Sequence, residues 1–287
     1  MEHQDKVALV TGCSSGIGEA TTVLLANAGY LVYATARNVA TLDRLRERAN
    51  NSSLSIETRQ LDVTNHDNIM GIISEIKDKH GGLEVLVNNA GYALLGTIED
   101  IPIEDLRKQM EVNVFGLVSI CKAVLPLMRH NECGTIVNIS SVAGRISVPL
   151  MGAYCASKFC VEALSDALRA EVHQFGIRVV TIEPGPVQTK FTENALREST
   201  HIIYNKNSPY LRAYGKLKSM YEDGWGRGKS ANHVAKKILK AIQARRPRAR
   251  YAIRLRDKFY IWAGALTTTK IGQRAMRGYL RLNPRKT

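Results

Sequence analysis

Short runs of apolar and β-branched residues alternate with longer amphipathic segments along the chain as far as about residue 185. The segments between the runs predict helices near 17–28, 41–50, 65–80, 104–130 and 151–175. The runs themselves, several of them apolar throughout as in strands buried on both faces, predict strands at 7–10, 31–34, 54–56, 85–87, 135–139 and 177–182. Because strands that alternate with helices form right-handed βαβ units, the pattern predicts a doubly wound parallel sheet, the Rossmann-type α/β fold.

The pattern changes beyond that point. Residues 186–228 contain Pro186, Pro209 and several tyrosines between short apolar stretches. Apolar residues at helical spacing after Ala231 predict one more helix, and residues 250–253 predict a last strand. We expect a single domain over residues 1–255 and a basic, amphipathic extension over residues 256–287.

The composition is that of an ordinary globular protein, with 45% hydrophobic and 23% charged residues among 287. The N-terminus leads almost at once into the first predicted strand, without the basic and apolar regions of a signal peptide. The five cysteines show neither a disulfide framework nor the spacing of metal ligands. No uninterrupted apolar run approaches the ~20 residues of a membrane-spanning helix. We expect a cytoplasmic protein without a metal site.

The net charge of +14 is concentrated at the C-terminal end. Residues 229–287 carry 17 Lys and Arg but one acid, Asp257, whereas the rest of the chain is almost neutral. Aromatic and apolar residues such as Phe259, Trp262 and Ile271 lie among these basic residues, as in helices that lie in a membrane interface. The alternative, which we favour, is a tail helix that covers the core or a neighbouring subunit and leaves a solvated basic face. We expect no nucleic-acid partner, although a basic patch is compatible with one.

Candidate chemistry lies just after the predicted strands, because parallel α/β sheets bind ligands beyond the carboxyl ends of their strands. The first strand is followed by Thr11-Gly12-Cys13-Ser14-Ser15-Gly16-Ile17-Gly18 and then by a predicted helix. Glycines permit a tight turn and a close approach of the backbone to a phosphate, and the helix N-terminus offers free N–H groups. The glycine spacing differs from the Gly-x-Gly-x-x-Gly of dinucleotide sites, so a plain glycine-rich turn is the alternative to a cofactor loop.

The end of the second strand bears on the choice of nicotinamide cofactor. A carboxylate about 20 residues beyond the glycines would bind the ribose 2′-hydroxyl of NAD, but no acid occurs between Ala20 and Leu42. Arg37 stands there instead, and a guanidinium suits the 2′-phosphate of NADP by its charge and its forked donors. We expect NADP(H) to be preferred over NAD(H). The alternative for Arg37 is a solvated loop cation.

Polar or turn-forming residues follow each of the later strands. In chain order they are Asp62-Val63, Asn88-Asn89-Ala90-Gly91, Ser140-Ser141 and Pro184-Gly185-Pro186-Val187-Gln188-Thr189. Asparagine and glycine at a strand end are often only turn formers. Asn113 lies inside a predicted helix, where asparagine is a mediocre helix former, so either a function or a capped or solvated position must explain it.

Tyr154 and Lys158 lie four residues apart in a predicted helix and therefore one turn apart on the same face. A nearby ammonium favours the phenolate and lowers the pKa of a tyrosine from its ordinary value of about 10. In a partly desolvated cleft the pair can act as an acid–base catalyst. Taken alone, Tyr-x-x-x-Lys is a weak signal, because most such pairs lie on solvated helix surfaces.

Together these motifs resemble those of the short-chain dehydrogenase/reductase family, over residues 5–190. The matching segments, in the family's order, are Thr11 to Gly18 for Thr-Gly-x-x-x-Gly-x-Gly, Asn88 to Gly91 for Asn-Asn-Ala-Gly, Tyr154 to Lys158 for Tyr-x-x-x-Lys, and Pro184-Gly185 for Pro-Gly. Four matches in order are far more specific than any one of them. Residues 32–35 and 154–159 and the long C-terminal part look most like the branch of hydroxysteroid and retinol dehydrogenases.

The resemblance implies a catalytic tetrad of Asn113, Ser141, Tyr154 and Lys158. Ser141 is chosen over Ser140 because it precedes Tyr154 by 13 residues, as in the family. The implied cofactor contacts are Gly12, Ser14, Ser15, Gly16, Ile17, Gly18, Arg37, Asp62, Val63, Asn89, Ala90, Gly91, Tyr154, Lys158, Pro184, Gly185, Val187 and Thr189. Residues 186–228 would form a lid over an apolar substrate pocket, lined by Leu94, Leu95, Val148 and Met151 unless these are ordinary packing residues.

The implied reaction is hydride transfer between NADP(H) and a hydrophobic secondary alcohol, or a primary alcohol, and its carbonyl compound. Tyr154 would exchange a proton with the substrate oxygen, Ser141 would polarise that oxygen, and Lys158 would lower the tyrosine pKa and bind the nicotinamide ribose. Asn113 would hold a water that relays protons. The resemblance also implies a homo-oligomer, a dimer or a tetramer. The alternative from another class is a non-catalytic NADP-sensing protein on the same fold, against which the complete tetrad argues.

Overall fold

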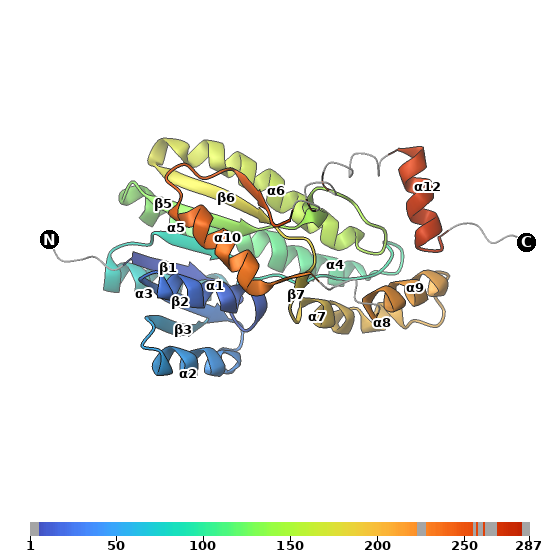
Figure 1. Ribbon diagram of the computed structural model, residues 1–287, viewed down its shortest axis with the longest axis horizontal. Coiled ribbons are helices and arrows are strands. Elements are labelled where there is room, and N and C mark those ends of the chain that lie inside the picture. Colours follow the sequence, from blue (N-terminus) through green and yellow to red (C-terminus); the bar gives the residue numbers. More distant parts are fainter. Residues whose placement is uncertain (1–5, 223–227, 255–256, 258–260, 262–268, 283–287) are drawn as a thin grey trace, which may run out of the picture.

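The computed structural model describes residues 6–222, 228–254, 257, 261 and 269–282. Parallel strands form one seven-stranded sheet in the order β3-β2-β1-β4-β5-β6-β9 (Figure 1). They are β1 (Lys6–Val10), β2 (Tyr30–Ala36), β3 (Ile56–Gln60), β4 (Val85–Asn88), β5 (Gly134–Ile139), β6 (Ile177–Glu183) and β9 (Arg250–Ala252). The order runs outward from β1 in both directions, so the sheet is doubly wound, and the predicted Rossmann-type fold is confirmed.

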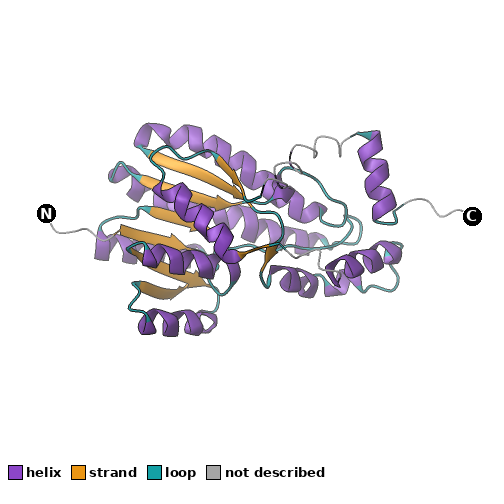
Figure 2. Ribbon diagram, viewed as in Figure 1, coloured by secondary structure: helices purple, strands orange, loops and turns teal. Residues whose placement is uncertain are grey.

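Helices cover both faces of the sheet, as Figure 2 shows. Alternate residues of each central strand enter two separate cores: in β1, Val7 and Leu9 belong to one core and Ala8 and Val10 to the other. The first core is completed by α3, α5 and α6, and the second by α1, α2 and α10. The bounds are α1 (Gly16–Asn27), α2 (Asp43–Asn51), α3 (His66–His80), α4 (Ile103–Met110), α5 (Leu117–His130), α6 (Gly152–Val172) and α10 (Ala231–Gln243).

The third strand differs from the prediction at 54–56. It begins at Ile56 and runs to Gln60, at the edge of the sheet, where β2 is its only neighbour among the described residues. An edge strand pairs on one side only and faces solvent on the other. The polar sequence Glu57-Thr58-Arg59-Gln60 can therefore form it without an apolar run that would reveal it.

The long helix predicted at 104–130 has an irregular middle. Between α4 and α5 the chain forms a π-helical turn at Glu111–Gly116, which includes Asn113. A Cβ built on Gly116 would lie 2.7 Å from a methyl carbon of Val63, so the turn packs closely on the loop after β3. Such turns are rare and occur frequently at functional sites.

The helical stretch 103–130 is also long enough to span a membrane, and an 18-residue window within it is apolar enough, with a mean hydropathy of 1.6. It is the one stretch with this property in the part of the chain that the structure describes. Its side chains Ile120, Val124 and Leu127 belong to the first core, where they pack with strands and with α3. We therefore interpret it as a core helix.

Beyond the carboxyl ends of the strands, residues 187–222 form a helical segment, here called the cap. Buried cap residues such as Ala195, Ile202 and Tyr214 pack in a third cluster with Leu94 and Leu95 of the loop after β4. The elements of this region are β7 (Val187–Gln188), α7 (Phe191–Glu198), α8 (Thr200–Ile203), α9 (Leu211–Glu222), β8 (Lys229–Ser230), which pairs with β7, and the C-terminal helix α12 (Lys270–Tyr279). Phe259 and Trp262, which suggested an apolar tail, lie outside the described residues.

Candidate active site

The glycine loop after β1 makes a narrow turn at the N-terminus of α1. Gly12 and Gly16 have φ angles of 71° and 64°, a region that favours glycine. A Cβ on Gly18 would lie 2.3 Å from the carbonyl oxygen of Gly12, so no larger residue fits without a shift of the backbone. The N-cap residue Ser15 makes no side-chain capping bond, so it does not occupy the N–H groups of the first turn. The loop has the shape and the polarity that a phosphate requires.

Asn89 and Thr11 tie the loop after β4 to the glycine loop. The Asn89 amide donates to the carbonyl oxygens of Thr11 and Gly12, both at 2.9 Å. In return the Thr11 hydroxyl accepts the backbone N–H groups of Asn89 and Ala90, at 3.0 and 2.9 Å. The amide of Asn89 is thus engaged in shaping the glycine loop, a role that its position at a strand end did not reveal.

Other predicted cofactor residues line the same edge of the sheet. Arg37 is exposed at the end of β2, and the methyl carbon of Thr189 would lie 2.9 Å from a Cβ on Gly16. The Asp62 carboxylate accepts two hydrogen bonds within its own turn, while Val63 is buried against the π-helical turn. The side chain of Val63 therefore packs against this turn, whereas Arg37 is exposed and Thr189 lies beside the glycine loop.

The turn after β6 attaches the C-terminal part of the chain. A Cβ on Gly185 would lie 2.5 Å from both Arg254 and Asp257. These two form a buried ion pair, with 2.6 Å between Arg254 Nη2 and Asp257 Oδ1. The absence of a side chain at Gly185 thus makes room for this pair.

Asn113 joins the loop after β4 to α6. Its Oδ1 accepts the backbone N–H of Tyr92 at 3.0 Å, and its Nδ2 donates to the Tyr92 carbonyl at 2.9 Å and to the Ser157 hydroxyl at 3.0 Å. Only 1% of the residue is exposed, so it is not a solvated helix position. A Cβ on Gly91 would lie 3.0 Å from Oδ1, which leaves little room for a larger residue there.

Helix α6 carries Tyr154 and Lys158, each 6% exposed, into the layer beneath these loops. Lys158 Nζ lies 5.8 Å from the centre of the Tyr154 ring and donates a hydrogen bond of 2.8 Å to the Ile139 carbonyl at the end of β5. Burial lowers the pKa of Lys158 to about 8, although the negative charge of Glu162, one turn further along α6, acts to raise it. The ammonium is therefore held beside the phenol, as the spacing of the two residues predicts.

The two serines after β5 have different surroundings. The half-buried Ser141 hydroxyl donates to the Pro184 carbonyl at 3.3 Å and accepts the backbone N–H of Ala143 at 3.1 Å. Ser140 is 3% exposed, and its Oγ would lie 2.7 Å from a Cβ on Gly144. Ser140 is thus covered by the turn at 142–144, whereas Ser141 keeps a part of its surface exposed.

Behind Lys158 lies a charged cluster that the sequence did not single out, formed by Glu162, Glu183, Arg145 and Arg250. Arg250 Nε lies 2.9 Å from a carboxylate oxygen of Glu162 and 3.6 Å from one of Glu183. Arg145 lies 3.9 and 3.6 Å from the same two carboxylates. Burial, and then the charge of Glu162, raise the pKa of Glu183 to about 7. Two buried carboxylates thus share two guanidiniums directly behind the predicted catalytic lysine.

Tyr154 also belongs to the apolar cluster beneath the cap. The ring centre of Phe191, at the start of α7, lies 5.7 Å from that of Tyr154. The same cluster contains the residues expected to line an apolar pocket, namely Leu94, Leu95, Val148 and Met151. No sequence motif had singled out Phe191 among the aromatic residues of this region.

Several hydrogen bonds fasten the cap to the segment after β4. The Ser199 hydroxyl accepts the backbone N–H of Leu95 at 2.7 Å. The Tyr214 hydroxyl donates to the Asp100 carboxylate at 2.6 Å. The cap is therefore held over the Tyr154 end of the sheet by polar as well as apolar contacts.

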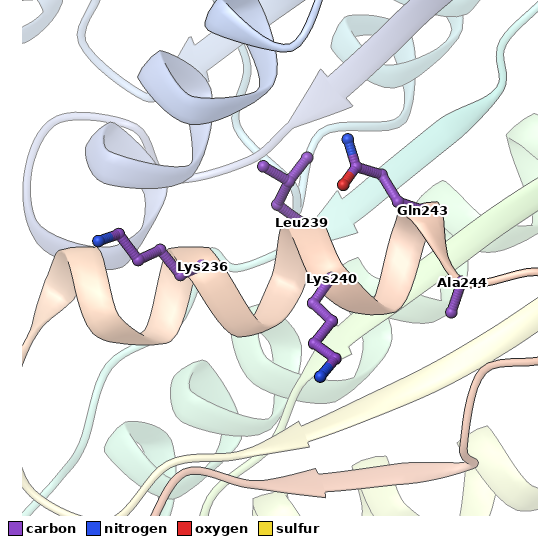
Figure 3. Close-up of a pocket in the computed structure, with 5 residues that line it drawn as sticks. All are labelled: Lys236, Leu239, Lys240, Gln243 and Ala244. Atoms are coloured by element: carbon purple, nitrogen blue, oxygen red, sulfur yellow. The ribbon is translucent and has the colours of Figure 1, made fainter.

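A shallow surface depression lies elsewhere, on the outer side of α10. Its lining consists of Lys236, Leu239, Lys240, Gln243 and Ala244 (Figure 3). A single helical segment and its C-cap supply all five residues, and none of them is a predicted site residue. We therefore do not interpret it as a part of the active site.

Known proteins resemble this chain over most of its length. The family described as short chain dehydrogenase matches residues 6–200. The NADPH-dependent 3-dehydrocapnine reductase of Ornithobacterium rhinotracheale is 36% identical over 254 residues, 86% of this chain and 88% of that protein. The 3-ketodihydrosphingosine reductase of Bacteroides thetaiotaomicron is 34% identical over 244 residues, 85% of this chain and 86% of that protein. A solved short-chain dehydrogenase from Streptomyces avermitilis has a TM-score of 0.79 at 30% identity and covers 98% of this chain and 99% of its own.

Proposed function

The chain belongs to the short-chain dehydrogenase family, and on that premise we propose that it interconverts a hydrophobic secondary alcohol and its ketone with NADP(H), using Tyr154 as acid and base. Membership makes it an oxidoreductase that acts on CH–OH groups and binds a nicotinamide cofactor. The observation that carries the finer proposal is the setting of Tyr154. Its ring neighbours the Lys158 ammonium of the same helix and Phe191 of the apolar cap.

The residues at the edge of the sheet fit a nicotinamide dinucleotide. The turn from Gly12 to Gly18 would hold the pyrophosphate, because it combines glycine-only backbone angles with the N-terminus of α1. Thr189, which packs on Gly16, would bind the nicotinamide carboxamide. When bound, the nicotinamide supplies or accepts the hydride.

In the reducing direction, Tyr154 donates its phenolic proton to the carbonyl oxygen of the substrate. Ser141 donates a hydrogen bond to the same oxygen and so polarises the carbonyl group. Lys158 stabilises the phenolate that remains, as long as it keeps its own proton. Asn113, through its hydrogen bonds to Tyr92 and Ser157, fixes the loop after β4 against α6, and we expect it to order the water that reprotonates the pair. Oxidation reverses these steps.

The variant Tyr154→Phe tests the assignment. It removes the proton donor and keeps the ring, so NADPH binding should persist while turnover falls by about 10²–10⁴-fold. Near-normal turnover by this variant would refute the role of Tyr154. Tight NADPH binding by the wild type, with no NADPH consumed for any carbonyl compound, would favour the NADP-sensing alternative.

The preference for NADP(H) rests on Arg37, which is exposed at the end of β2 where a 2′-phosphate would lie. One relative is named as NADPH-dependent. A charge-assisted hydrogen bond contributes about 1.5–3 kcal/mol, so Arg37→Ala should raise the KM for NADPH by about 10–100-fold. The KM for NADH is the internal control and should change little.

For the substrate we propose a long-chain 3-keto compound. Both relatives are named as reductases of 3-keto or 3-dehydro compounds, and the apolar cluster around Tyr154 suits a hydrocarbon chain. NADPH absorbance with long-chain 3-keto compounds, steroids, retinoids and aromatic ketones should give the highest kcat/KM for the first class. Higher values for steroids or retinoids would instead assign the chain to the branch of hydroxysteroid and retinol dehydrogenases.

We also propose a homo-oligomer that forms through the outer face of α6. Exposed residues without a charge recur along α6 at a spacing of three or four, namely Ala156, Phe159, Ala163, Ala167 and Ala170, and Leu164 lies beside them. Phe159 is 43% exposed and Leu164 39%, and such an apolar stripe is typical of a protein interface. Phe159→Glu should lower the mass observed by light scattering, whereas an unchanged mass would exclude this face.

A further inference from the structure

The C-terminal helix α12 carries its basic residues on one face. Lys270, Arg274 and Arg277 follow one another at a spacing of four and three residues, and Arg281 comes four residues later. At 3.6 residues per turn Lys270, Arg274 and Arg277 fall on one narrow stripe of the helix. Arg281 follows just after the end of the helix, and all four residues are exposed. The tail offers no charge to neutralise them, because its only acid, Asp257, is buried and paired with Arg254.

The C-terminal end of α12 packs against the cap. Leu280, just after the helix, is 4% exposed and belongs to the apolar cluster that includes Tyr154. Lys216 of α9 lies 5.3 Å from the ring centre of Tyr279. Figure 1 shows α12 and α9 at the same end of the molecule. The basic stripe is therefore held in a fixed place beside the cap.

Ile271 is 83% exposed at the start of the same helix. An isoleucine beside a row of arginines is the pattern of a helix that lies flat in a membrane interface, with its cations at the head groups and its apolar side chains deeper. A nucleic acid would match the charges but would offer nothing apolar to the isoleucine.

We propose that α12 docks the protein onto an anionic lipid bilayer through Lys270, Arg274, Arg277, Arg281 and Ile271. Docking in this way brings the cap, and the apolar cluster beneath it, next to the lipid. That the bilayer also delivers the substrate rests on the proposed function, but the docking itself does not.

Vesicle flotation of the full chain tests the docking. The protein should float with vesicles of phosphatidylcholine and phosphatidylglycerol, stay in solution with phosphatidylcholine alone, and be released by salt. Each basic residue near an anionic surface strengthens binding by about fivefold, so Arg274→Gln with Arg277→Gln should weaken partitioning by about 25-fold. Ile271→Ser should weaken it further without altering the charge.

The matched control removes two exposed lysines of α10, Lys236→Gln with Lys240→Gln, which line the depression in Figure 3. It changes the net charge equally and should bind vesicles like the wild type. Three results would overturn the proposal: a wild type that ignores anionic vesicles, equal losses in the α10 and α12 variants, or a smaller oligomer for the α12 variant with unchanged flotation, which would make a second copy the partner. Flotation needs no turnover, so a failed reductase assay and a failed docking assay are distinguishable.

Discussion

Replacing Glu183 with glutamine should stabilise the protein at alkaline pH far more than at acidic pH. Glu183 is 4% exposed at the end of β6, and burial together with Glu162 raises its pKa from 4.5 to about 7. A carboxyl group whose folded-state pKa exceeds its unfolded-state pKa binds protons more tightly when folded, so stability is lost as the pH rises between the two values. At about 1.4 kcal/mol per pKa unit, the full cost above pH 7 is about 3 kcal/mol.

Urea unfolding of the wild type and of Glu183→Gln at pH 5 and pH 8 measures this cost. The gain in unfolding free energy should be about 2.5 kcal/mol larger at pH 8 than at pH 5. At pH 5, just above the unfolded-state pKa, only a small part of the destabilisation by Glu183 is present. The control is Glu75→Gln. The pKa of Glu75 is lowered to about 2, chiefly by the hydrogen bond from Arg59. The ionised Glu75 carboxylate therefore stabilises the fold fully above about pH 4.5, and Glu75→Gln should lower the unfolding free energy by the same amount at pH 5 and pH 8. An equal effect of Glu183→Gln at both pH values would refute the reasoning.

Three further predictions concern the site itself. Gly18→Ala should abolish NADPH binding, measured by NADPH titration, because the new Cβ would lie 2.3 Å from the Gly12 carbonyl oxygen. The control is Gly71→Ala in α3, where a Cβ would have no neighbour within 4 Å. This control should raise the unfolding free energy by about 0.5–1 kcal/mol, measured by thermal unfolding. Reduction by the wild type should slow as the pH rises through about 8, where Lys158 loses its proton, and a kcat that stays flat to pH 10 would contradict this. Asn113→Ala leaves buried partners unpaired and should lower the unfolding free energy by about 1–3 kcal/mol, while kcat falls and the KM for NADPH changes little.

The central strands were predictable because residues on both of their faces are buried, so each strand is a nearly continuous apolar run. The bounds of the edge strand β3 were not predictable, since its outward residues are free to be polar. The π-helical turn at Glu111–Gly116 was equally hidden, because one irregular turn barely disturbs the helical spacing of apolar residues. What the sequence offered there was an asparagine in an unfavourable place.

The site was predictable as far as it depends on strand ends. Tyr154, Lys158, Ser141 and the glycine loop come from separate parts of the chain, and the parallel sheet brings them to one edge. The charged cluster behind Lys158 was not predictable, because Arg250 reaches Glu162 only through the pairing of β9 with β6. No local pattern encodes a contact between residues so far apart in the chain. Phe191 was missed for the same reason, since its neighbour Tyr154 lies on a different helix.

The π-helical turn has a consequence for how this gene can change. Removing a single codon between those for Glu111 and Gly116 would let the segment close into a regular α-helix, because a π-helical turn holds about one residue more than an α-helical turn. The apolar faces of α4 and α5 could readjust by small shifts, but Asn113 would no longer meet Tyr92 and Ser157 together. One in-frame deletion would thus keep the fold of the protein but disrupt the arrangement of side chains on which the proposed reaction depends.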